Sequence, residues 1–181
     1  MLAGIREQKY IYIKDFLSKE ELSILQPYCL DKVANASIND FDTQSLTAPS
    51  YYNDPIINIV LRNKIKKAEE ISKLSLYTTY AYWRGYTYGS ILEDHLDRPS
   101  CEISITANID SCGISWPIHM EHTDIEIKTG DAVMYLGCEL LHGRKNSFTG
   151  RYMAQAFFHY VDQKGGFKHH KGDQIVKMFG K

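Results

Sequence analysis

Four residues, His95, Asp97, His142 and Arg151, have the types and the order needed to bind a metal ion and an organic acid. Two imidazoles and one carboxylate on one face of an octahedral ion hold Fe(II) and leave positions open for O₂. An arginine nine residues after the second histidine can bind a carboxylate through two parallel N–H donors. If the four side chains converge, the sequence predicts an iron site beside a carboxylate-binding site.

The His-x-Asp pattern has little weight by itself. With 7 histidines and 12 aspartates in 181 residues, it is expected by chance about once in two such sequences. A second copy, His122-Thr-Asp124, is separated from His142 by 17 residues, about one hairpin, whereas 44 residues separate Asp97 from His142. The longer spacing leaves room for several strands to return, so we favour His95 with Asp97. We interpret His122 and Asp124 as a solvated strand face.

His95 and Asp97 would share one face of a strand, because side chains alternate between the two faces. Their odd numbers match the apolar odd positions of 101–107, so we expect the pair to open inward at one mouth of the core, provided that no bulge intervenes around Pro99. His159 is a competing third ligand. It lies deep in the last expected strand, eight residues past Arg151, and we expect it to be too far along that strand to share a mouth with Arg151.

Two helices are expected before residue 75. Ser18 and Glu21 form a capping box, so a helix should follow it and end near Pro27 or soon after, with Leu22, Ile24 and Leu25 among its buried residues. Asp54-Pro55 is typical of a helix start, and an apolar stripe extends that second helix to about Ser72. The polar stretch 31–53 between them is expected to be a long loop that could act as a lid.

The other expected elements are strands, at 10–16, 76–86, 101–109, within 116–127, at 132–136 and at 151–162. Helices first and many short strands afterwards indicate an α+β domain with a sandwich or barrel core.

Composition narrows the class of protein. The chain is 44% hydrophobic and 24% charged, which fits one globular domain. Its net charge of −1 gives no reason to expect nucleic acid or an anionic membrane as a partner. The sequence has no apolar run long enough to span a membrane and no apolar signal stretch near its start. Its four cysteines form no C-x-x-C pair, so we expect reduced thiols and a cytoplasmic location.

A longer ordered pattern connects these residues. It reads Tyr86-x-x-Gly89-x-x-Leu92-x-x-His95-x-Asp97, then Gly130-Asp131, then His142, and then Arg151-Tyr152. With the entry segment Phe16–Glu21, it resembles the 2-oxoglutarate- and Fe(II)-dependent oxygenases, and most closely their prolyl hydroxylase-like branch. The similarity covers most of the chain, loosely before residue 75 and more specifically over 76–162.

The resemblance implies a single oxygenase domain spanning 1–181. Its core would be a distorted double-stranded β-helix (jelly roll) over 76–162, with the helices of 1–75 outside one sheet and a peripheral tail at 163–181. The resemblance also implies a set of site residues: His95, Asp97 and His142 as iron ligands, Arg151 on 2-oxoglutarate, Tyr86 as a weaker candidate for that pocket, and Arg144 as a competitor for the co-substrate role.

The implied reaction is hydroxylation of an unactivated C–H, with O₂ and 2-oxoglutarate as partners and ascorbate as an optional reductant. Peptidyl proline is the first substrate expected, although collagen-type prolyl hydroxylases have lysine where this chain has Arg151. A free amino acid or another small metabolite is the alternative substrate, and a non-catalytic cupin-like binding module is the alternative function. Arg98, Trp116, Tyr51 and Tyr52 are candidates for the substrate entrance, and the sequence does not fix the oligomeric state.

Overall fold

A computed structural model describes residues 4–173 as two antiparallel sheets and a layer of helices. The larger sheet has the strand order β1-β8-β5-β10-β3-β2, with β1 Tyr10–Ile13, β8 Ala132–Leu136, β5 Ile103–Asp110, β10 Met153–Asp162, β3 Leu76–Tyr86 and β2 Ser50–Tyr52. The smaller sheet has the order β4-β9-β6-β7, with β4 Leu92–His95, β9 His142–Arg144, β6 Ile118–Met120 and β7 Thr123–Ile125. The helices are α1 Ile5–Gln8, α2 Lys19–Ala34 and α3 Pro55–Ser72, with short 3₁₀ turns η1 Ile38–Asp40, η2 Pro99–Cys101 and η3 Lys168–His170.

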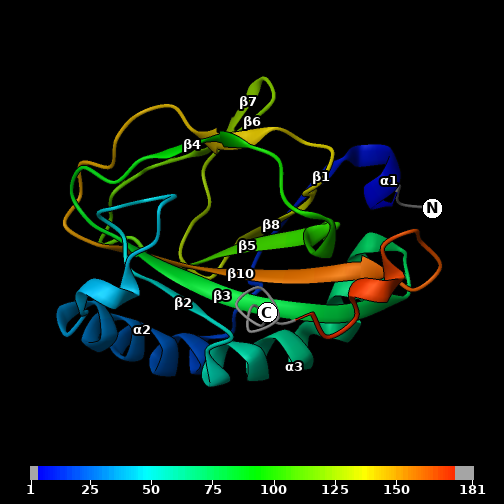
Figure 1. Ribbon diagram of the computed structural model, residues 1–181, viewed down its shortest axis with the longest axis horizontal. Helices are drawn as coiled ribbons and strands as arrows, with labels where there is room; N and C mark the ends of the chain where they lie inside the picture. The colour runs from blue at the N-terminus through cyan, green and yellow to red at the C-terminus, as the bar shows by residue number, and fades with distance from the viewer. Residues whose placement is uncertain (1–3, 174–181) are drawn as a thin grey trace.

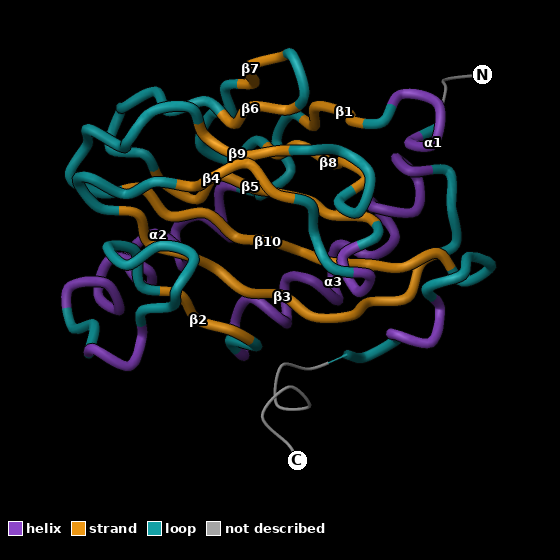
Figure 2. Tube along the Cα trace, turned by 45° about the horizontal axis from the view of Figure 1, so that its top comes forward, coloured by secondary structure: helices purple, strands orange, loops and turns teal. Residues whose placement is uncertain are grey.

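The elements stack in three layers. Figure 1 shows the smaller sheet at the top, the larger sheet in the middle, and α2 and α3 beneath the larger sheet. Figure 2 shows β9 and β4 of the smaller sheet facing β10 and β3 of the larger one. The expected double-stranded β-helix with helices outside one sheet is therefore confirmed. No helix within residues 4–173 combines the length and apolar character needed to cross a membrane.

Alternation along β10 decides what faces each layer. Ala156 and Phe158 belong to the apolar core shared with the helices. Gln155, Phe157 and His159 have the opposite parity and face the space between the sheets. That space therefore receives polar side chains from a strand that is buried along almost its whole length.

The first helix is longer than expected. The capping box is present, with Ser18 Oγ accepting from the amide of Glu21, but α2 passes through Pro27 and ends at Ala34. Leu25 and Cys29, on either side of the proline, are fully buried against the sheet, and this packing outweighs the lost backbone hydrogen bond. Of the residues expected to be buried, Leu25 is buried and Leu22 is partly buried, whereas Ile24 is 60% exposed.

The second expected helix, α3, begins as expected, because Asp54 accepts from the amides of Ile56 and Ile57 and Pro55 occupies the first turn.

Gly85 lets α2 approach β3, since a Cβ there would lie 2.2 Å from Val33 Cγ2.

The stretch expected to be one long loop, 31–53, contains the end of α2, η1 and the short edge strand β2. The first strand is also shorter than expected, because β1 ends at Ile13.

Candidate metal centre

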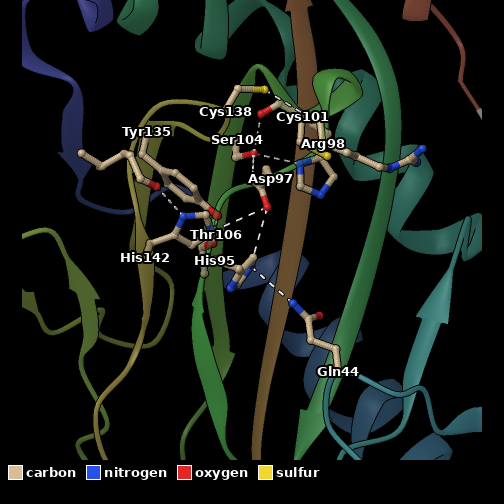
Figure 3. Close-up of polar contacts among 12 residues, drawn as sticks. Gln44, His95, Asp97, Arg98, Cys101, Ser104, Thr106, Tyr135, Cys138 and His142 are labelled. Atoms are coloured by element: carbon tan, nitrogen blue, oxygen red, sulfur yellow. Dashed lines mark hydrogen bonds and ion pairs between the residues drawn. The ribbon is translucent and has the colours of Figure 1, made fainter.

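His95, Asp97 and His142 converge between the two sheets. Asp97 Oδ1 lies 3.8 Å from His95 Nε2 and 3.6 Å from His142 Nε2, and the two imidazole centroids are 4.4 Å apart. Figure 3 shows the three side chains pointing toward one another. The two histidines face each other because β4 pairs with β9 in the register His95↔His142. A small inward movement would bring all three to the 2.0–2.2 Å of a nitrogen- or oxygen-ligated metal ion.

Both histidines are fixed in one tautomer. His95 Nδ1 lies 2.8 Å from the carbonyl oxygen of Glu93, and His142 Nδ1 lies 2.8 Å from that of Leu140. A carbonyl only accepts, so each Nδ1 carries a proton and each Nε2 presents a lone pair to the centre. Burial lowers the pKa of His142, which keeps its ring in the neutral form that a metal requires.

Asp97 is oriented by two neighbours. Ser104 Oγ donates to Asp97 Oδ2 over 2.7 Å, and the amide of Asp97 donates to the carbonyl of Gly137 over 2.9 Å. A Cβ on Gly137 would lie 2.4 Å from both Asp97 Oδ2 and the carbonyl oxygen of Cys101, so only glycine fits there. The free carboxylate oxygen, Oδ1, is the one that faces the histidines.

His159 lies closer to this centre than its place in the sequence suggested. Its ring, Asp97 and Cys101 offer ligand atoms within 4.8 Å of one another. His159 is buried, and this burial lowers its pKa to about 4. Arg151 is exposed, so the two residues do not share a mouth, but His159 lies beside the centre, because β10 runs past the carboxylate and His159 Nδ1 meets Ser104 Oγ at 3.0 Å.

Arg151 does not reach the space between the sheets. Its side chain is exposed, and β10 begins only at Met153. The expectation that the last strand offers Arg151 to the interior is wrong, because the residue lies in a bend before the strand starts, where the alternation of strand faces does not apply.

Arg144 occupies the interior position instead. It is 5% exposed, its guanidinium donates to the Trp116 carbonyl and, over 2.6 Å, to Gln155 Oε1, and its charge lies 4.2 Å from the Trp116 ring centroid. Its buried Nε has no hydrogen-bond partner within residues 4–173, and the guanidinium carbon lies 5.8 Å from the centroid of the Tyr86 ring. Burial lowers the pKa of Arg144 to about 10, and no carboxylate is among the groups that shift this pKa. Within residues 4–173 the guanidinium thus has no anionic partner.

Two cavities adjoin the metal centre. Of the four residues expected at the substrate entrance, two line one of these cavities and two pack elsewhere. Tyr52 and Arg98 line a cavity of about 220 Å³ together with His95 and Asp97. Tyr51 stacks on Trp83 on the helix side of the sheet, so it does not line this cavity. Trp116 packs beside Arg144 and borders neither cavity of the centre.

Gln44 was not identified from the sequence. It lines both the 220 Å³ cavity and a second cavity of about 410 Å³, and its Nε2 lies 3.4 Å from His95 Nε2. Arg84, fully buried on β3, holds this segment by donating to Gln44 Oε1 over 2.9 Å and by pairing with Asp42 over 2.5 Å. No local pattern marks these residues, because their partners lie about 40 positions away in the chain.

The second His-x-Asp copy stays at the surface, as interpreted. His122 is exposed, and Asp124 pairs with His119 and Lys145 on the outer hairpin. The four cysteines are all free thiols, in line with the expectation from their spacing.

No protein-family model and no curated protein matches this sequence. Several solved structures match its fold. The non-heme alpha-ketoglutarate-dependent epimerase SnoN from nogalamycin biosynthesis has a TM-score of 0.69 at 9% identity, over 87% of this chain and 79% of that chain. The viral collagen prolyl hydroxylase vCPH from Paramecium Bursaria Chlorella virus-1, solved with 2-oxoglutarate, gives 0.65 at 13% identity, over 87% and 98%. HygX from Streptomyces hygroscopicus, solved with nickel, 2-oxoglutarate and hygromycin B, gives 0.66 at 12% identity, over 86% and 84%. The chain therefore has the double-stranded β-helix fold of the 2-oxoglutarate- and Fe(II)-dependent oxygenases.

Proposed function

We propose that this protein is an Fe(II)- and 2-oxoglutarate-dependent oxygenase that hydroxylates an unactivated C–H bond. The observation that carries the proposal is the convergence of two Nε2 lone pairs on one carboxylate oxygen, which lies 3.6 and 3.8 Å from them. Beside them is a buried arginine without an anionic partner among the described residues. Matching solved structures include proteins described as bound to 2-oxoglutarate and nickel, which supports the same assignment. The reaction converts substrate R–H, O₂ and 2-oxoglutarate into R–OH, succinate and CO₂.

The donor set fits the metal. His95 and His142 supply neutral nitrogen ligands and Asp97 supplies the anionic oxygen, which is the ligand set that non-haem Fe(II) uses with three positions left open. Bound iron with the 2-oxo acid supplies the oxidising chemistry. The protein supplies geometry, since Glu93, Leu140 and Ser104 hold the ligands in place.

We assign the distal carboxylate of 2-oxoglutarate to Arg144. Arg144 follows His142 by two residues on β9, so the two side chains share a face about 7 Å apart. A short dicarboxylate can bridge that distance. A buried guanidinium next to the Trp116 and Tyr86 rings is strongly stabilised by a carboxylate, because the low local dielectric strengthens the pair. Arg151 is too exposed for this role.

Two substrate classes stay in the proposal. Peptidyl proline is supported by the match to a collagen prolyl hydroxylase, and a small metabolite is supported by the match to a structure with hygromycin B bound. The cavity beside Asp97 bears on the choice and is treated below.

The test is an anaerobic titration of metal-free protein with Fe(II) and 2-oxoglutarate, followed by visible absorption. We expect a charge-transfer band that needs both additions and disappears in His142→Ala, whereas His122→Ala, a surface histidine, keeps it. Metal binding without a band would favour a cupin-like binding module. A chain that binds no metal would refute the proposal.

A further inference from the structure

The 220 Å³ cavity beside Asp97 has aromatic walls and is also lined by a histidine, His159. Tyr52 and Tyr82 stack with centroids 4.6 Å apart, and Tyr80 lies 4.7 Å from the His159 ring. His159 lines this cavity while only 2% exposed, and its Nε2 has no hydrogen-bond partner among residues 4–173. A buried nitrogen that lacks a partner, on a residue that lines a cavity, points to a ligand that completes it.

The neighbours of Ser104 fix the tautomer of the His159 imidazole. Ser104 Oγ lies 2.7 Å from Asp97 Oδ2, 3.1 Å from the Cys101 carbonyl and 3.0 Å from His159 Nδ1. The carboxylate and the carbonyl only accept, so the single hydroxyl proton goes to one of them. His159 Nδ1 must therefore carry a proton and donate to Ser104. In the neutral ring, Nε2 is then a hydrogen-bond acceptor.

We propose that this cavity receives the part of the substrate that carries the reacting C–H, and that His159 Nε2 accepts a hydrogen bond from an N–H or O–H group of that substrate. The inference rests on the proposed function and assigns its substrate class: a compact molecule with a donor next to its reacting carbon, such as a free amino acid or a polar metabolite. The tyrosine faces pack against its apolar portion.

A proline within a peptide does not fit this requirement. Its nitrogen is a tertiary amide without a hydrogen, and its ring carries only carbon-bound hydrogens. It would displace water from the cavity and leave His159 Nε2 buried and unpaired, which disfavours its binding. Sites built to hydrogen-bond a substrate group discriminate strongly against analogues that lack it. The cavity therefore favours the small-molecule alternative over peptidyl proline.

The test uses the full chain loaded with Zn(II) and 2-oxoglutarate, so that no turnover occurs, and a metal-free sample in parallel. Imidazole ¹⁵N labelling lets NMR read the protonation of each ring nitrogen. The probes are matched pairs: L-proline methyl ester with its N-acetyl form, cyclopentanol with methoxycyclopentane, and tetrahydrofuran-3-ol with its methyl ether.

We expect His159 Nε2 to be unprotonated in the free protein. At least one donor-bearing probe should shift the Nε2 resonance and bind about tenfold more tightly than its blocked partner. His159→Phe, which keeps an aromatic ring, should reduce that ratio to about one. His159→Gln, which keeps a carbonyl acceptor, should retain part of it. If a variant fails to fold, the Nε2 protonation and the probe-induced shifts measured on the wild-type protein still decide the question.

Three results would each overturn the inference: a protonated Nε2 in the free protein, equal affinity within every pair, or no Nε2 shift with any donor-bearing probe. None of them depends on oxygen chemistry. A failure of the proposed function would be seen separately, as a missing charge-transfer band with Fe(II) and 2-oxoglutarate.

Discussion

The Arg144 guanidinium and the His142 imidazole project from the same face of β9, two residues apart, and both are buried. One short strand therefore carries a candidate metal ligand and a candidate carboxylate receptor in fixed register. The first prediction follows from this pairing. Arg144→Gln should weaken 2-oxoglutarate binding on the order of a hundredfold, because losing one partner of a buried charge pair costs roughly 2–5 kcal/mol.

Titration of the Fe(II)–2-oxoglutarate band measures this effect. Arg151→Gln is the matched control, because that side chain is exposed, and it should change the affinity less than about twofold. A larger effect at Arg151 than at Arg144 would return the co-substrate role to Arg151.

A second prediction concerns Gly137. Gly137→Ala should abolish Fe(II) binding, since the new Cβ would lie 2.4 Å from Asp97 Oδ2 and from the backbone oxygen of Cys101. Neither the ligand nor the backbone can move without disturbing the centre. Gly166→Ala is the control, because its Cβ meets nothing within 4 Å. Equal Fe(II) affinity in the two variants, measured by calorimetry, would show that Asp97 tolerates displacement.

A third prediction tests the support of the anionic ligand. Ser104→Ala removes the 2.7 Å hydrogen bond to Asp97 Oδ2 and should lower metal affinity about 10- to 100-fold, as losses of such supporting contacts do. Ser23→Ala is the control and should leave the affinity unchanged, because the Ser23 hydroxyl donates to the Glu20 carbonyl on the exposed face of α2. An unchanged affinity in Ser104→Ala would mean that backbone contacts alone orient Asp97.

A fourth prediction concerns the Asp42–Arg84 pair. Although burial raises the pKa of Asp42, the Arg84 charge and hydrogen bonds from Ser50 and Ser45 lower it below its usual value of 3.8. Its stabilisation is therefore complete above about pH 4 and is lost as pH falls through the lower folded-state pKa. Asp42→Asn should destabilise the protein by about 1–3 kcal/mol, since Arg84 is fully buried.

Urea unfolding at pH 7 and pH 3 measures this effect. The difference between wild type and Asp42→Asn should shrink at the lower pH, and Glu70→Gln, an exposed carboxylate, should match wild type at both. A difference that grows toward pH 3 would contradict the assigned sign.

Local sequence patterns and the order of residues along the chain were enough to predict the fold and the convergence of three side chains at the centre. The convergence of His95, Asp97 and His142 could be predicted because β4 pairs directly with β9. The parity argument required an uninterrupted alternation around Pro99, and this condition is not met. The turn η2 breaks the alternation there, so the even residue Ser104 of β5 faces the centre and odd Ile105 faces the helices.

Contacts that depend on tertiary packing could not be predicted from the sequence. Arg151 has the expected spacing after His142, but the strand starts two residues later and leaves it in a bend. Gln44 and His159 reach the centre from a loop and from the middle of a long strand, and nothing adjacent in sequence marks either one. The expected tail lies partly beyond residue 173, outside the described residues.

The carbonyls of Glu93 and Leu140 hold both imidazoles in the metal-binding tautomer through hydrogen bonds made within the chain. The conformational entropy of ordering these ligands is therefore lost during folding and not again when metal arrives. Such a preformed site accepts any divalent ion of suitable size, and intrinsic affinity would follow the order in which Ni²⁺ and Cu²⁺ exceed Fe²⁺. Which ion fills the centre would then depend on metal supply in the cell, and purified protein would carry whatever ion its host left most available.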